Sequence, residues 1–157
     1  MKQGIKLLFM DVDGTLTDGR IYMGENGELF KAFDVKDGFA INELLPELGI
    51  TPVIITGRVS KIVENRAREL HITELYQGVR DKLGTMLEVM KKYGCTKENA
   101  AYIGDDLPDA ECMRECFLAA CPADAAQEVK EVCGFVCKNK GGSGAVRDFI
   151  DFLADNR

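Results

Sequence analysis

The sequence contains no tryptophan, one histidine and four prolines, and it has no long hydrophobic run. No apolar stretch approaches the ~20 residues that a membrane-spanning helix needs, and the first residues do not have the pattern of a secretory signal. We therefore expect a cytoplasmic protein with no membrane partner. The one histidine, His71, is far in sequence from every cysteine and is predicted to be an exposed loop residue.

The chain also has fewer positive than negative residues, with 20 lysines and arginines against 26 aspartates and glutamates, which gives a net charge of −6. This balance argues against binding to the phosphate backbone of nucleic acids. The proportions of apolar residues (46%) and charged residues (29%) are those of an ordinary globular protein. The length of 157 residues suits one domain, which we expect to span residues 1–157.

The six cysteines include no C-x-x-C pair, which is the usual sign of a zinc or redox site. Cys112 and Cys116 are four residues apart on a predicted helix, and Cys121 and Cys137 end apolar runs. We interpret the cysteines as small buried hydrophobic residues of a reducing compartment, in preference to disulfide partners or metal ligands.

Short apolar runs alternate with helical segments along the chain. The predicted strands are residues 5–10, 51–56, 75–77, 100–104, 117–121 and 134–137. The predicted helices are roughly residues 38–47, 59–70, 80–93, 108–115, 124–131 and 143–154. This alternation predicts an α/β fold, with a Rossmann-like, mostly parallel sheet and helices on both faces.

One segment, at about residues 19–33, breaks this alternation. Two apolar stretches flank Asn26-Gly27, a strong hairpin-turn signal, so we expect an inserted β-hairpin between the first strand and the first helix. An isolated hairpin is only marginally stable and would expose residues such as Ile21 and Phe30. The hairpin is therefore expected to associate with other copies of the chain.

The sequence Asp11-Val12-Asp13-Gly14-Thr15 directly follows the first predicted strand. Open α/β sheets bind their ligands at the carboxyl ends of the strands. Two carboxylates one residue apart can divide the work of catalysis, since one can attack or hold a metal while the other carries a proton. Alone, the pattern is also compatible with an acidic turn.

Groups that can bind an anion follow other strands. Thr56, Gly57 and Arg58 leave the second sheet strand, where the hydroxyl and the glycine amide could bind one anionic oxygen. Lys82 opens a later helix and could bring a positive charge to the same edge. Such donors suit a phosphoryl group in transfer. Taken singly, the Thr56-Gly57 pair could equally be a simple turn, and Lys82 could be a solvated lysine.

Three more carboxylates, Asp105, Asp106 and Asp109, follow the predicted strand at 100–104. An aspartate here could simply cap the next helix. Together with Asp11 and Asp13, however, Asp105 would provide hard oxygen ligands, which suit Mg²⁺. The metal set and the phosphoryl set make sense together, so the sequence favours phosphoryl chemistry.

In this order, Asp11-x-Asp13, Thr56, Lys82 and Gly104-Asp105-Asp106-x-x-Asp109 resemble the four motifs of the haloacid dehalogenase superfamily. No insertion large enough for a separate cap domain is present. Residues 18–38 and the glycine-rich segment 141–147 are similar to the capless sugar-acid phosphatases of that superfamily. The resemblance extends over essentially the whole chain.

The resemblance implies a role for each motif residue. Asp11 is the nucleophile that forms an aspartyl-phosphate, and Asp13 is the general acid and base. Mg²⁺ is held by Asp11, Asp105 and the backbone carbonyl of Asp13. Thr56 and Lys82 hold the phosphoryl group. The implied assembly is a homotetramer built on the hairpins.

The resemblance also implies that the substrate is the phosphomonoester of an acidic 2-keto-3-deoxy sugar, first of all 3-deoxy-D-manno-octulosonate 8-phosphate. The expected substrate-binding residues are Asp34, Val35, Lys36, Asp37, Gly38, Gly57, Arg58 and Arg66. Enzymes for that substrate usually have Asn-Val-Arg-Asp-Gly where this chain has residues 34–38, and an arginine where this chain has Ser143. Nine-carbon acid 9-phosphates therefore remain an alternative, as does a non-catalytic module that partners a cytidylyltransferase.

Overall fold

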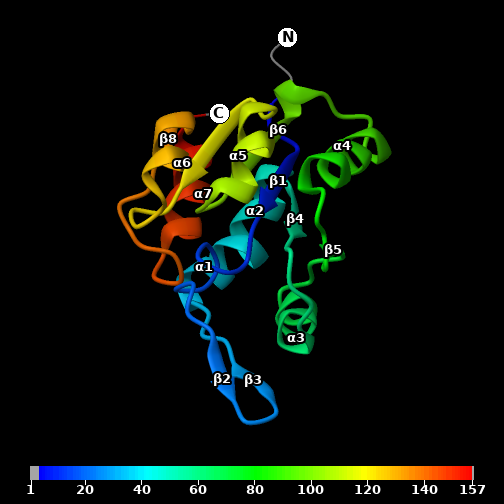
Figure 1. Cartoon of the computed structure of the whole chain (residues 1–157). Helices are drawn as coiled ribbons and strands as arrows, with labels where there is room; N and C mark the ends of the chain where they lie inside the picture. The colour runs from blue at the N-terminus through cyan, green and yellow to red at the C-terminus, as the bar shows by residue number, and fades with distance from the viewer. Residues whose placement is uncertain (1–3, 157) are drawn as a thin grey trace.

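A computed structural model describes residues 4–156 of the chain. Its main sheet has six parallel strands in the order β5-β4-β1-β6-β7-β8 (Figure 1). The strands are β1 (Leu7–Met10), β4 (Thr51–Ile55), β5 (Glu74–Tyr76), β6 (Ala100–Ile103), β7 (Leu118–Cys121) and β8 (Phe135–Val136). The predicted Rossmann-like α/β fold is confirmed, and each predicted strand agrees with an observed one to within two residues at either end.

Helices connect the strands. They are α1 (Val35–Phe39), α2 (Leu45–Leu48), α3 (Lys61–Glu69), α4 (Lys82–Lys92), α5 (Leu107–Arg114), α6 (Gln127–Val132) and α7 (Ala145–Asp155). A π-helical segment, η1 (Ala40–Leu44), joins α1 to α2, and a short 3₁₀ turn, η2 (Lys97–Asn99), precedes β6. The helix predicted at 38–47 is thus a longer composite of three segments.

The sheet separates two hydrophobic cores, because successive strand residues point to opposite faces. Leu8 and Met10 of β1 lie in the core covered by η1, α2, α3 and α7, whereas Leu7 and Phe9 lie in the core covered by α4, α5 and α6. Both faces of β1 are therefore buried, which explains its continuous apolar run. The central position of β1 places the residues after Met10 at the middle of the carboxyl edge.

The inserted hairpin consists of β2 (Tyr22–Gly24) and β3 (Gly27–Phe30). Figure 1 shows it projecting away from the sheet and its helices. Gly27 has a φ of 116°, a left-handed conformation that favours glycine at this turn. The side chains of Met23 and Leu29 are 60% and 64% exposed, so the hairpin leaves an apolar surface uncovered.

The glycine-rich segment at 141–144 supports the loop after β1. A Cβ added at Gly141 would lie 2.0 Å from the carbonyl oxygen of Gly14, and the Gly142 amide donates to the Thr15 carbonyl. Only residues without a side chain allow this close approach. The segment therefore fixes the backbone that carries Asp11 and Asp13.

All six cysteines are free thiols. Four of them are buried, whereas Cys95 and Cys133 are only partly buried, so the prediction of buried cysteines holds for four of the six. His71 is exposed, but it is not without a partner, because its Nδ1 lies 2.8 Å from the Asn42 Oδ1. Within residues 4–156, no helix combines the length and the apolar character that crossing a bilayer requires.

Candidate active site

Three carboxylates meet at the carboxyl edge of the sheet. Asp11 follows β1, Asp105 follows the neighbouring β6, and Asp109 lies in the first turn of α5. One oxygen of each lies within 4.8 Å of the others, which is the arrangement needed to share a metal ion. The two motifs that are 94 residues apart in the sequence are therefore brought together because β1 and β6 pair directly.

The electrostatics of this cluster favour a cation. Burial, and next the charge of Asp109, raise the pKa of Asp11 to about 6. Burial, and next the charge of Asp11, raise the pKa of Asp105 to about 8. Gly14 makes room for this pair, since a Cβ there would lie 1.9 Å from the Asp105 Oδ2. Hard oxygen donors that repel one another in this way fit Mg²⁺.

Lys82 supplies the positive charge that was predicted for it. Its Nζ donates to the Asp11 Oδ1 at 3.0 Å and to the Asp109 Oδ1 at 2.9 Å, and its side chain is 8% exposed. Burial alone would lower the pKa of Lys82, but the charges of Asp11 and Asp109 outweigh burial and raise it. Lys82 is therefore a buried ammonium that touches the predicted nucleophile.

The contacts of Asp109 are those of a structural partner of Lys82, and its oxygens are not free to bind a metal. Its Oδ1 also accepts a hydrogen bond from the buried Tyr102 hydroxyl at 2.7 Å, and its Oδ2 accepts from the amides of Asp105 and Asp106. Both oxygens are thus already bonded. Of the three carboxylates, Asp11 and Asp105 are the two that were predicted to hold a metal.

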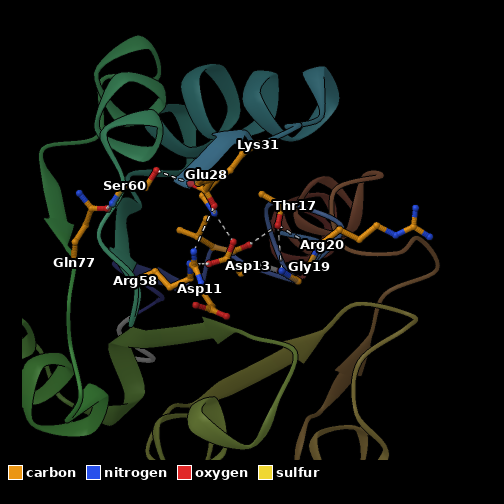
Figure 2. A network of polar contacts seen from close by, with 12 residues as sticks. Asp11, Asp13, Thr17, Gly19, Arg20, Glu28, Lys31, Arg58, Ser60 and Gln77 are labelled. Carbon is orange, nitrogen blue, oxygen red and sulfur yellow. Dashed lines mark hydrogen bonds and ion pairs between the residues drawn. The ribbon is translucent and has the colours of Figure 1, made fainter. Parts of the chain in front are cut away.

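The side chain of Asp13 points toward two cations, Lys31 and Arg58 (Figure 2). Its Oδ1 lies 2.6 Å from the Lys31 Nζ, and its Oδ2 lies 3.9 Å from the Arg58 Nε. Asp11 and Asp13 thus occupy different environments, since Asp11 pairs with Lys82 whereas Asp13 faces Lys31 and Arg58. The predicted contribution of Asp13 to the metal is its backbone carbonyl, so this orientation does not conflict with it.

Thr56 and Gly57 lie at the end of β4, the other neighbour of β1. Thr56 is buried, and the surroundings of Gly57 are open apart from the Val79 carbonyl. Arg58 is half exposed and lies 3.7 Å from Glu28 as well as near Asp13. These residues border the acidic cluster on the side opposite to Asp105, as the order of the strands requires.

The predicted substrate-binding segment 34–38 is largely engaged in holding the fold. Asp34 caps α1, since its Oδ1 accepts from the amides of Lys36 and Asp37. Asp37 is buried and accepts from the amide of Arg147, so it caps α7, whose own cap residue is a glycine. Chiefly because of burial, the pKa of Asp37 rises to about 7.

Arg66 is likewise occupied. It pairs with Glu69 at 2.9 Å, donates to the Asp34 carbonyl, and stacks over Phe33. A Cβ at Gly38 would lie 2.5 Å from the Arg66 Nη2, so that glycine accommodates the arginine.

Val35 and Lys36 are exposed, and among the described residues the Lys36 ammonium has no ion pair. Arg58 and Lys36 are thus the predicted cations whose charge the described residues engage least.

Sequence reasoning missed four residues around the site: Glu28, Lys31, Ser60 and Tyr102. Glu28 and Lys31 come from the hairpin, which the sequence suggested only as an assembly element. Tyr102 lies within an apolar strand, where a tyrosine is expected to be a hydrophobic core residue. The sequence did offer one indication that the hairpin contributes to the site. Two charged residues, Glu28 and Lys31, lie in and just after a predicted strand that is otherwise apolar.

Residues 60–150 match the model of a family described as haloacid dehalogenase-like hydrolase. The chain is also 45% identical over 151 residues to the 3-deoxy-D-manno-octulosonate 8-phosphate phosphatase KdsC of Escherichia coli K12, covering 96% of this chain and 80% of that protein. The chain belongs to the haloacid dehalogenase-like hydrolases. The predicted superfamily is therefore confirmed, and the matched relatives are named as phosphatases.

Comparison with solved structures supports the same family assignment. The fold is similar to 3-deoxy-D-manno-octulosonate 8-phosphate phosphatase of Moraxella catarrhalis in complex with magnesium, phosphate and KDO, with a TM-score of 0.93 and 39% identity over 98% of this chain and 87% of that one. It is also similar to the cobalt-bound enzyme of Haemophilus influenzae, with a TM-score of 0.93 and 36% identity over 97% and 88% of the two chains. Members of this hydrolase family with this fold thus hold divalent metals.

Proposed function

We propose that this hydrolase is a Mg²⁺-dependent phosphatase of an acidic 2-keto-3-deoxy sugar phosphate, with 3-deoxy-D-manno-octulosonate 8-phosphate as the first candidate. The observation that carries the proposal is the position of Asp11, in hydrogen-bond contact with Lys82 and beside the carboxyl group of Asp105. A carboxylate nucleophile needs neutralised charge around the phosphoryl group that it attacks. We propose residues 1–157 as one functional unit, because both cores share one sheet.

In the proposed reaction, an Asp11 carboxylate oxygen attacks phosphorus, and the bond from phosphorus to the sugar oxygen breaks. Lys82 and the groups at Thr56 and Gly57 stabilise the charge on the phosphoryl oxygens. Asp11 and Asp105 would hold Mg²⁺, with the Asp13 carbonyl, and the metal would add further neutralisation of that charge. Water then attacks phosphorus and releases phosphate and a free Asp11.

Asp13 is the proposed proton carrier. The sugar oxygen leaves as an alkoxide unless it receives a proton, so the Asp13 carboxylic acid donates one as the bond breaks. In the second step the Asp13 carboxylate takes a proton from the attacking water. The different partners of the two carboxylates support this role, since Asp13 faces Lys31 and Arg58 whereas Asp11 pairs with Lys82.

Two observations support an acidic sugar as the substrate. Arg58 offers a half-exposed cation 3.9 Å from Asp13, and the similar Moraxella catarrhalis structure is a complex with KDO. Asp34, Lys36 and Ser143 differ from the residues expected for the eight-carbon substrate, so nine-carbon acid 9-phosphates are the second candidate. A lysine cannot reproduce the bidentate grip of an arginine on a carboxylate.

The test is a kcat/KM panel with Mg²⁺ across 3-deoxy-D-manno-octulosonate 8-phosphate, the 9-phosphates of 2-keto-3-deoxynononate and N-acylneuraminate, and neutral hexose phosphates. We expect the acidic sugars to be preferred by at least about tenfold, because one well-placed ion pair contributes 1.4 kcal/mol or more. Preference for a neutral sugar phosphate would contradict the proposed substrate class. Absence of phosphate release from every compound would favour a non-catalytic module.

We also propose that the hairpins assemble the chain into a homotetramer. Met23 and Leu29 leave apolar area exposed on a two-stranded sheet that has marginal stability alone. Sedimentation at micromolar concentration should give a tetramer, and the double variant Met23→Glu, Leu29→Glu should give smaller species. Leu87→Glu, at an exposed leucine of α4, is the matched control. A monomeric wild-type protein would refute the assembly.

The cytoplasm is the proposed compartment. Six free cysteines are usual where thiols stay reduced, and none is paired in a disulfide.

A further inference from the structure

Lys31 is the one charged side chain of the hairpin segment that is almost completely buried. It follows β3, its side chain is 2% exposed, and its Nζ lies 2.6 Å from the Asp13 Oδ1 and 3.0 Å from the Glu28 Oε2 (Figure 2). A buried ammonium is stable only when it is paired. Here its partners are one carboxylate of the hairpin and the proposed proton carrier.

Glu28 fixes Lys31 from the other side. Its Oε1 accepts from the Ser60 hydroxyl at 3.1 Å, and Arg58 lies 3.7 Å from its Oε2. The Ser60 amide in turn donates to the Gln77 side chain at 2.8 Å. Burial opposes ionisation of Glu28, but hydrogen bonds from Lys31 and Ser60 outweigh it and keep the pKa of Glu28 below its usual value. A continuous chain of contacts therefore ties the hairpin to the loop before α3.

This geometry leaves Asp13 with one oxygen engaged and one available. Lys31 binds Oδ1 at close range, whereas the nearest cation to Oδ2 is Arg58 at the long distance of 3.9 Å. The carboxyl group is therefore fixed in rotation, with Oδ2 free to meet a leaving-group oxygen. A carboxyl group that rotates freely would spend less time in the geometry that proton transfer requires.

We propose that Lys31 is a positioning residue that acts through Asp13, so that the hairpin is part of the catalytic machinery as well as an exposed apolar surface. The inference rests on the proposed phosphatase function. It has a specific consequence, because of the two proton transfers proposed for Asp13 only the one to the leaving group differs between substrates, whereas hydrolysis of the aspartyl-phosphate is common to all of them. Substrates with a basic alkoxide leaving group need that proton, whereas p-nitrophenolate is stable without it.

The experiment compares Lys31→Met and Lys31→Arg on two substrates, p-nitrophenyl phosphate and the sugar-acid phosphate preferred in the panel. With Lys31→Met, we expect kcat/KM on the sugar phosphate to fall by about 10²-fold, the lower range of a general acid's contribution. The fall in kcat/KM on p-nitrophenyl phosphate should be no more than a few-fold, because kcat/KM excludes the later hydrolysis of the aspartyl-phosphate. Lys31→Arg keeps a cation at this position and should restore most of the lost kcat/KM.

Lys61→Met is the matched control, since Lys61 is an exposed lysine paired only with Glu64, and it should change neither rate. Glu28→Gln provides a second variant if Lys31→Met unfolds, with the same selective loss on the sugar phosphate. An equal loss on both substrates, or no loss on either, would overturn the role of Lys31. A wild-type protein that releases phosphate from neither substrate would instead overturn the proposed function, before any variant is made.

Discussion

Replacing Asp11 with asparagine should abolish phosphatase turnover while the protein stays folded. Asparagine has the size of aspartate but no nucleophilic carboxylate, and loss of a covalent nucleophile lowers kcat by on the order of 10⁴-fold or more. The fold should tolerate the change because Asp11 belongs to a crowded acidic cluster, and Lys82 keeps Asp109 as a partner.

The measurement is release of phosphate from p-nitrophenyl phosphate and from the sugar-acid phosphate, with urea unfolding as the check on stability. We expect the free energy of unfolding to change by no more than about 1 kcal/mol, the usual range for a tolerated substitution. Asp18→Asn is the control, since Asp18 is an exposed carboxylate on the same loop. An Asp11→Asn protein that retains a tenth of the wild-type rate would exclude Asp11 as the nucleophile.

Replacing Lys82 with methionine should damage both activity and stability. Lys82 is buried between Asp11 and Asp109, so its removal leaves two buried carboxylates without a cation. Breaking a buried ion pair by removing one partner costs about 3–5 kcal/mol. Activity should fall by about 10²-fold or more as well, since the lost charge would no longer stabilise the phosphoryl group.

Urea unfolding in metal-free buffer measures the first effect, and kcat with saturating Mg²⁺ measures the second. Lys91→Met is the matched control, because Lys91 is an exposed lysine on the same helix, α4. Unfolding free energies that agree between Lys82→Met and the wild type would show that the lysine is not the structural partner of Asp11 and Asp109.

The sequence predicts the sheet, and the edge of it that carries the acidic cluster, for a physical reason. A strand buried on both faces must be continuously apolar, so Leu7–Met10 and Ala100–Ile103 are visible in the sequence. Parallel strands end at the same edge, so Asp11 and Asp105 could be placed together without coordinates. The pairing of Lys82 with Asp11 follows from the same topology.

The structural contacts of the predicted substrate-binding residues could not be read from the sequence. Asp37 caps α7 through a contact 110 residues away in sequence. Arg66 pairs with Glu69 and packs on Phe33. Local patterns show that a residue is charged, but only the tertiary contacts show which partners its side chain already has.

Lys31 and Glu28 were missed for a related reason. Their contacts with Asp13 and Ser60 depend on where the hairpin lies relative to the sheet. The pattern of apolar and polar residues predicts that a hairpin forms, but it does not predict which part of the protein the hairpin contacts. The hairpin was correctly predicted as an element, whereas its contribution to the site was not.

We predict that Asp11 forms a covalent phosphoryl intermediate, and the stereochemical course at phosphorus reports on that intermediate. The substrate would be a phosphorothioate monoester that is chiral at phosphorus because it carries sulfur and two different oxygen isotopes, and it would be hydrolysed in water labelled with a third oxygen isotope. Two successive in-line displacements, first by Asp11 and then by water, each invert phosphorus and together retain its configuration. We predict retention. Net inversion would mean that water attacks the substrate directly, and it would exclude an aspartyl-phosphate at Asp11.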